Sequence, residues 1–214
     1  MLYTRAVKCP HCHTTNEGFR SLCKACGHVL QPGAHVVLRA PTSADDPRWD
    51  VRDDLVKFDE RGDGLTAEVA PARSTRVLMT SGPVLDDAAL ELTASVTCEQ
   101  LDKAAGFALD LRVQKRSLYR AEALLSGWYR INRVDDGKST VLGRVKAPDL
   151  NLGESRVLRF EAAGDRLRLA VDGTLLLSLR DDRHRFGSAR VVAVPGDNEL
   201  IVVKWSGLTI TAPA

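Results

Sequence analysis

Short stretches in which apolar and polar residues alternate recur through most of the chain after Trp49. In the run from Gly106 to Val113, every second residue from Phe107 onward is apolar, and the intervening positions include Asp110 and Arg112. A period of two is typical of a β-strand with one buried face. We expect further strands at Leu90 to Thr97, Trp128 to Val134, Val157 to Ala162, Leu167 to Val171, Leu175 to Leu179, Ala189 to Val194 and Leu200 to Ile210.

Turn-forming residues separate these runs at short intervals, and Asp172-Gly173 predicts a two-residue hairpin. Many short strands with such spacing predict a mainly β fold, an antiparallel β-sandwich over residues 48–214. Residues 31–47 contain three prolines, with Gly33 and Ser43, and are predicted to be a linker, in which His35 to Arg39 fits a short strand. Only Glu99 to Ala105 and Tyr119 to Leu125 suggest helix, and the second also fits a strand.

Residues 1–30 contain two Cys-x-x-Cys pairs, Cys9 with Cys12 and Cys23 with Cys26. Two tight turns of this kind supply a closed tetrahedral shell of thiolates for one Zn²⁺. Four thiolates leave no open position for water, so we expect a structural ion that replaces the core a 30-residue unit cannot build. Disulfides are disfavoured because the N-terminus lacks an apolar signal core, which predicts a reducing, cytoplasmic location.

The segment resembles the short bacterial zinc ribbon, with its Cys-Pro-x-Cys followed by Cys-x-x-Cys-Gly. It departs from that family at His13, where Gly is usual. The fifth cysteine, Cys98, stands alone in an alternating run and is predicted to be a small buried residue rather than a nucleophile.

Composition and charge exclude several classes of protein. The 214 residues are 44% hydrophobic and 27% charged, values typical of a globular protein. The net charge of +2 gives no general attraction to nucleic acid or a membrane surface. Uninterrupted apolar runs are only a few residues long, which is too short for a membrane span.

The second domain resembles the concanavalin A-like lectin/glucanase sandwich, in its laminin G-like and 3-keto-disaccharide-hydrolase-like branch. The resemblance is carried by the order of several runs, including Trp49, Gly127 to Arg133, Arg166 to Gly173 and Val203 to Ile210. It implies a jelly roll and, for glucanase members, a strand motif Glu-x-Asp-x-x-Glu that supplies the catalytic carboxylates.

That motif is absent from the sequence, because Thr93 rather than a carboxylate stands two residues after Glu91. The sequence therefore names no catalytic residue and favours a protein that is not an enzyme. Asp181 and Asp182 are expected in a solvated loop beside an exposed His184. Trp49 and Trp205 are expected in the core or in strand pairing.

Alternation predicts a ligand surface on the concave sheet face. If Phe107 and Tyr129 point into the core, five other side chains point outward: Asp110, Arg112, Trp128, Arg130 and Asn132. An aromatic ring among Arg, Asp and Asn suits a sugar, through stacking and hydrogen bonding. The competing and favoured interpretation is a solvated sheet face with charge pairs across strands.

From these patterns we hypothesise a non-catalytic binding or scaffold protein. The zinc ribbon would dock it, and the sandwich would recognise a protein partner first and a glycan second. One alternative is a nucleic-acid-linked adaptor that binds through its basic ribbon. Nucleic acid is disfavoured because the few basic residues of the ribbon form no cluster interleaved with aromatic residues. The other alternative is a carbohydrate-active enzyme with an atypical site.

Overall fold

The computed structural model describes most of the chain. The described residues are 7–9, 12–16, 25, 35–41, 43, 45–52, 54–58, 64–72, 74–82, 84–99, 102–147, 151–197 and 200–212. Across these ranges the secondary structure consists of strands joined by turns, without helix. In that part of the chain there is accordingly no helix long and apolar enough to cross a membrane.

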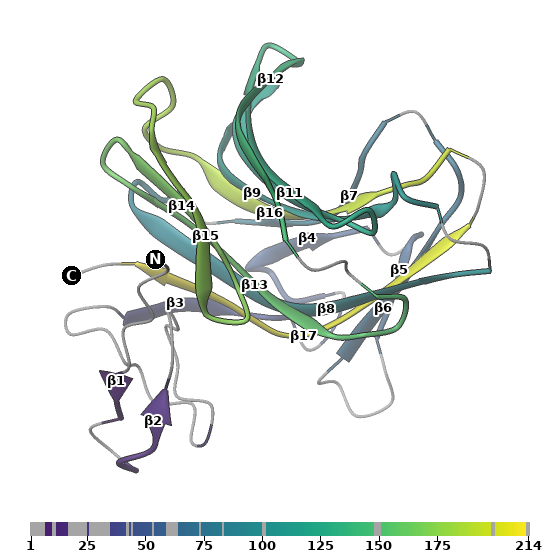
Figure 1. The fold of residues 1–214 in the computed structure, drawn as a ribbon, viewed down its shortest axis with the longest axis horizontal. Coiled ribbons are helices and arrows are strands. Elements are labelled where there is room, and N and C mark those ends of the chain that lie inside the picture. The colour runs from purple at the N-terminus through teal and green to yellow at the C-terminus, as the bar shows by residue number, and fades with distance from the viewer. Residues whose placement is uncertain are drawn as a thin grey trace.

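Two antiparallel sheets make up the sandwich, and Figure 1 shows them stacked one above the other. The seven-stranded sheet runs in the order β12 (Lys138–Lys146), β11 (Trp128–Asp135), β10 (Ser117–Leu124), β9 (Gly106–Gln114), β16 (Ser188–Val194), β7 (Arg76–Ser81) and β4 (Trp49–Val51). The eight-stranded order includes β15 (Thr174–Arg180), β14 (Arg166–Val171), β13 (Arg156–Ala163), β8 (Ala88–Cys98), β17 (Ile201–Ala212), β6 (Gly64–Val69) and β5 (Val56–Phe58).

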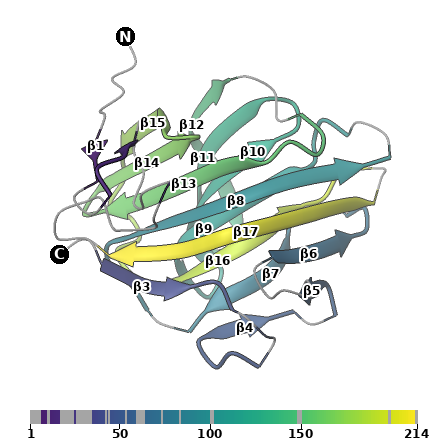
Figure 2. The ribbon, with the colours of Figure 1, turned by 90° about the horizontal axis from the view of Figure 1, so that it is seen from below.

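The eighth strand of the second sheet, β3 (His35–Arg39), pairs with the end of β17, as Figure 2 shows from below. The predicted linker over residues 31–47 therefore needs correction, because part of it is a strand of the sandwich. Leu38 lies in the core, and the Trp49 indole Nε1 donates to the Arg39 carbonyl at 2.8 Å. The first strand of the sandwich thus begins at His35, thirteen residues before the expected start at residue 48.

The core lies between the sheets and is filled by every second residue of each strand. Phe107, Leu109, Tyr129 and Ile131 are completely or almost completely buried there. Trp49 and Trp205 are also buried, as predicted. The sandwich of two antiparallel sheets predicted from the alternation is confirmed.

Backbone geometry confirms the predicted hairpin between β14 and β15. Asp172 and Gly173 have φ values of 48° and 79°, and Val171 pairs directly with Thr174. Positive φ at both central residues suits the two-residue turn that matches strand twist. The segment Tyr119 to Leu125, for which helix and strand were both open, lies largely in strand β10.

Candidate functional site

The outward surface of β9, β10, β11, β12 and β16 carries the residues that the sequence singled out, and we call it the outer face. In Figure 1 the upper sheet curves away from the lower sheet at the end that carries the β11–β12 turn. The outer face, which is the side of the upper sheet turned away from the lower one, is therefore concave. Its polar and charged members alternate with core residues along each strand: Asp110, Arg120, Glu122, Trp128, Arg130, Asn132, Arg144, Lys146 and Arg190. Asp110, Trp128, Arg130 and Asn132 therefore share one surface.

A buried ion pair lies at the centre of the outer face. Asp110 on β9 is 0% exposed and stands directly opposite Arg120 on β10. Arg120 donates from Nε and Nη2 to the two Asp110 oxygens at 2.7 and 2.8 Å, and from Nη1 to Thr75 Oγ1 at 2.8 Å. Burial lowers the pKa of Arg120, but attraction to Asp110 and the hydrogen bonds to it outweigh burial, so the pKa is raised. Arg120 therefore stays charged at neutral pH.

A second pair lies beside the first and leads to an exposed aromatic ring. Glu122 on β10 accepts a hydrogen bond from Arg130 on β11. Trp128, at the start of β11, is 36% exposed, and the guanidinium carbon of Arg144 lies 5.2 Å from its ring centroid. This distance is typical of a cation–π contact. The edge of the outer face therefore presents a tryptophan ring partly covered by a guanidinium.

Two polar atoms of the outer face lack a partner among the described residues. Asn132 Oδ1 and Arg190 Nε are both buried and make no hydrogen bond there. Arg190 lies opposite Asp110 on the side away from Arg120. Unsatisfied buried polar atoms are uncommon in folded proteins and need an explanation such as a bound water or ligand.

Arg112 does not belong to the outer face, which corrects the alternation-based expectation. Its φ of 55° breaks the regular strand, and its side chain is almost completely buried. Its guanidinium donates to the carbonyls of Asp86, Gly164 and His184 at 2.8–2.9 Å and to Asp87 Oδ1 at 3.0 Å. Arg112 therefore ties together three loops at one end of the sandwich.

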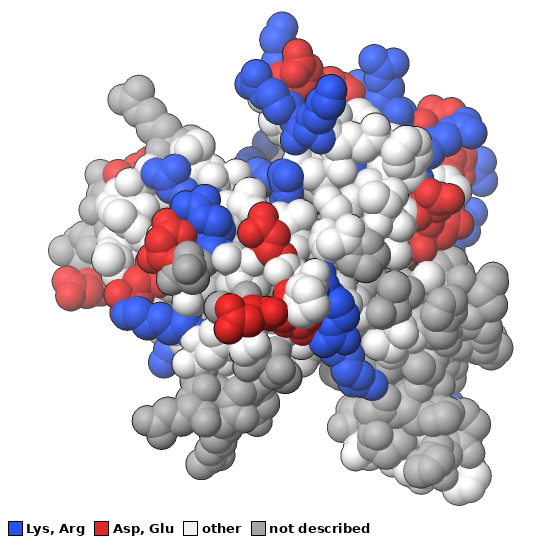
Figure 3. All heavy atoms as spheres, turned by 180° about the vertical axis from the view of Figure 1, so that it is seen from behind, with Lys and Arg blue, Asp and Glu red and all other residues white. Residues whose placement is uncertain are grey.

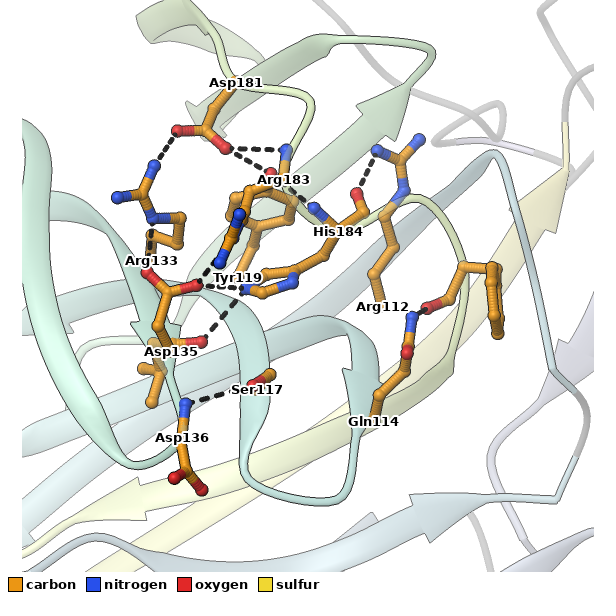
Figure 4. A network of polar contacts seen from close by, with 12 residues as sticks. Arg112, Gln114, Ser117, Tyr119, Arg133, Asp135, Asp136, Asp181, Arg183 and His184 are labelled. Atoms are coloured by element: carbon orange, nitrogen blue, oxygen red, sulfur yellow. Dashed lines mark hydrogen bonds and ion pairs between the residues drawn. The ribbon is translucent and has the colours of Figure 1, made fainter.

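The same end holds the polar network drawn in Figure 4. The Tyr119 hydroxyl donates to Asp181 at 2.5 Å and accepts the His184 backbone N–H at 3.0 Å. Arg133 donates to Asp181 and to Asp135 at 2.7 Å each. Burial and the hydrogen bond to Asp181 raise the pKa of Tyr119 far above its ordinary value. Burial raises the pKa of Asp181, but the hydrogen bonds from Tyr119, Arg133 and the Arg183 backbone outweigh it and lower the pKa.

His184 was expected on an exposed loop, and this is wrong. The side chain is buried, with Nε2 3.0 Å from the Val134 carbonyl oxygen and its ring centroid 5.0 Å from that of Tyr119. Asp181 is also largely buried rather than solvated, whereas Asp182 is exposed. Because these groups satisfy one another, we interpret the network as a clamp on loops.

An open hollow of about 590 Å³ adjoins the clamp, lined by the β9–β10 and β11–β12 turns with Arg183 and His184. Figure 3 shows mainly Lys and Arg around the top of the molecule, while acidic and basic residues mix elsewhere on that face.

No group of three or more His, Cys, Asp or Glu side chains arranged for a metal occurs among the described residues.

The first cysteine pair lies in a tight turn between β1 (Val7–Lys8) and β2 (Thr15–Asn16). The His13 amide donates to the Cys9 carbonyl at 3.0 Å, and Cys9 N–H donates to the Thr14 carbonyl at 2.9 Å. His13, at the position where the family has Gly, has a φ of 60°. Cys23 and Cys26 lie outside the described residues.

Sequence reasoning missed several members of the outer face. Arg120 and Glu122 lie in a segment whose secondary structure was ambiguous, and Arg144 lies in β12, for which no strand was expected. The alternation of Arg120 and Glu122 with Tyr119, Ala121 and Ala123 was the available signal.

Comparisons with known proteins give the fold and no family. No protein-family model matches the chain, and no curated protein matches it. Among solved structures, the carbohydrate-binding module CBM66 from Bacillus subtilis is similar, with a TM-score of 0.62 and 17% identity, covering 76% of this chain and 94% of that one. SCLam, a non-specific endo-β-1,3(4)-glucanase from family GH16, gives 0.60 and 11%, covering 86% and 93%. The Bacillus licheniformis β-glucanase gives 0.57 and 8%, covering 83% and 92%.

These similarities overturn the hypothesis of a non-catalytic docking or scaffold protein with a protein partner. The similar structures include three glucanases, a glycosidic hydrolase and a carbohydrate-binding module. At identities of 17% or less they show that this chain shares the jelly-roll fold of those structures, and the fold alone.

Proposed function

We propose that the protein is carbohydrate-active and that a saccharide binds across the outer face, over Trp128. The observation that carries this proposal is the exposed Trp128 ring beside the Arg144 guanidinium on a concave sheet face. Sugar rings place C–H groups on aromatic faces, while Arg and Asn side chains bond their hydroxyl oxygens. Asn132 Oδ1, which is buried and makes no hydrogen bond to any residue that the structure describes, adds an acceptor for a hydroxyl or a bound water. Glucanases and a carbohydrate-binding module with the same fold support the proposal.

Hydrolysis is a second candidate because two carboxylates share the outer face. Asp110 and Glu122 lie on neighbouring strands and are diagonal neighbours in the register. Residues in such positions are about 7–8 Å apart. This separation falls within the range of ~5 to 9.5 Å found between the two catalytic carboxyl groups of glycosidases. Each carboxylate already bonds an arginine, so catalysis requires a substrate that displaces Arg120 or Arg130.

Affinity electrophoresis tests the proposal with native gels that contain barley β-glucan, laminarin, xylan or alginate. We expect at least one polysaccharide to retard the protein, and Trp128→Ala to weaken that retention about tenfold, because the ring loses its apolar contact with the sugar. Phe186→Ala is the matched control, since Phe186 is an exposed aromatic residue in the loop between β15 and β16, where its carbonyl accepts a hydrogen bond from Gln114. A reducing-sugar assay on the same polysaccharides separates hydrolysis from binding. If none of these polysaccharides retards the protein and none releases reducing sugar, the proposal is contradicted.

We also propose that Cys9, Cys12, Cys23 and Cys26 hold one structural zinc ion. The support is the turn around Cys9 and Cys12, together with the spacing of the second pair. The ion would contribute folding energy to residues 1–30 and no chemistry. Elemental analysis of the purified chain should give about one zinc per chain, and Cys9→Ser should lower it, whereas Cys98→Ser should not. Equal zinc content in both variants contradicts the assignment.

A further inference from the structure

Cationic side chains outnumber carboxylates on the outer face. The cations are Arg120, Arg130, Arg144, Lys146 and Arg190, and the carboxylates are Asp110 and Glu122. The whole chain is nearly neutral, with a net charge of +2. The excess of positive charge is therefore a property of this surface.

The two carboxylates are already neutralised within the face. Asp110 accepts both of its bonds from Arg120, and Glu122 accepts one from Arg130. Three cations of the face make no ion pair with any described residue, and we call them the unpaired cations: Arg144, Lys146 and Arg190. Among the described residues, the buried Nε of Arg190 also has no hydrogen-bond partner.

Two of these cations lie beside the tryptophan. Lys146 stands directly opposite Trp128 in the β11–β12 ladder, and Arg144 stands directly opposite Arg130. Like charges opposite each other on neighbouring strands are destabilising unless an anion lies between them. The Arg144 guanidinium lies against the Trp128 ring, where it can also reach a group on a sugar stacked there.

We propose, building on the carbohydrate function above, that the saccharide bound over Trp128 is anionic, with carboxylate or sulfate groups on its rings. The ring contacts Trp128, and its anionic groups pair with Arg144 and Lys146. Charge-assisted bonds from arginine to oxyanions are among the stronger polar contacts in proteins. The unpaired cations at this edge thus select a charged sugar over a neutral one.

Isothermal titration with polygalacturonate and its fully methyl-esterified form tests the proposal, because the two polymers share a backbone and differ in charge. Dextran sulfate set against dextran gives the same comparison for sulfate. We expect at least one anionic polymer to bind about tenfold or more tightly than its neutral counterpart. Added salt should weaken that binding. Polyglutamate, which has carboxylates without sugar rings, should bind at least tenfold more weakly than the preferred anionic polymer.

Lys146→Gln and Arg144→Gln should each weaken anionic binding about tenfold, and Lys146→Gln should leave any neutral binding unchanged. Lys204→Gln, which removes an exposed charge from the other sheet, is the matched control and should have no effect. The Arg144 guanidinium lies against the Trp128 ring, whereas Lys146 stands opposite Trp128 in the ladder, so comparing the two variants separates the loss of a charge from the loss of support for the ring. Equal binding of charged and neutral forms overturns the anionic preference while leaving the carbohydrate function standing, and polyglutamate binding as tightly as the sugars also overturns it. No binding to any saccharide here, together with no retention or release on the earlier panel, refutes both.

Discussion

Replacing Arg120 by Met tests whether the centre of the outer face is a buried charge pair. The substitution keeps a long apolar stem but leaves Asp110, which is 0% exposed, without the donors at 2.7 and 2.8 Å. Removing one partner of a buried ion pair costs about 3–5 kcal/mol, because the other charge stays buried and uncompensated. A domain of this size loses about 2–4 °C of melting temperature per kcal/mol. Arg120→Met should therefore lower it by roughly 6–20 °C.

Urea unfolding followed by tryptophan fluorescence measures the free-energy change, with Arg166→Met as the control. Arg166 is exposed on β14, and its loss should change stability by less than about 0.5 kcal/mol. Adding Asp110→Leu to Arg120→Met should recover much of the loss, because an apolar pair replaces a buried ionic one at little cost. A loss below about 1 kcal/mol for Arg120→Met, or no recovery in the double variant, would refute the buried-pair account.

Three further predictions concern the ends of the sandwich and one close strand contact. Hydrogen bonds lower the pKa of Asp181 in the folded state below its ordinary value of 3.8, so its contribution to stability is present above that value and is lost as pH falls through the folded pKa. Asp181→Asn should therefore make the free energy of unfolding depend less on pH in that window. An unchanged acid unfolding curve contradicts the assignment. Tyr119→Phe removes a hydroxyl that bonds both Asp181 and the His184 amide, so chemical denaturation should show a loss of about 1–3 kcal/mol; a loss near zero would mean that the clamp does not form. Gly106→Ala would place a Cβ 2.0 Å from the Ala123 carbonyl oxygen, so thermal unfolding should show a clear destabilisation, and an unchanged melting temperature argues against this strand spacing.

The pattern of alternation was enough to predict the two-sheet architecture and the direction of several side chains. Phe107 and Tyr129 point into the core and Asp110 and Trp128 point outward, because period two is fixed by strand geometry. The Asp172-Gly173 turn was equally predictable, since its residues tolerate positive φ. Local rules of this kind act within a few residues and can be recognised in one sequence.

Features that depend on distant segments could not be predicted in this way. Arg112 follows the alternation in sequence, but its positive φ sends the side chain toward loops 26 to 72 residues away. His184 looked like a loop residue, and its burial depends on Val134 and Tyr119, which belong to other strands. The pairing of Asp110 with Arg120 required the register of β9 and β10. Tertiary contacts decide these positions, and a single sequence does not contain them.

Saccharide binding by the outer face is the central claim, and titration of the full chain and of Trp128→Ala with the polysaccharide that the gels select tests it most directly. The account predicts saturable binding by the unmodified protein, about tenfold weaker binding by Trp128→Ala at an unchanged melting temperature, and unaltered binding by Phe186→Ala. Binding that survives intact in Trp128→Ala, or that is lost equally in Phe186→Ala, would contradict it.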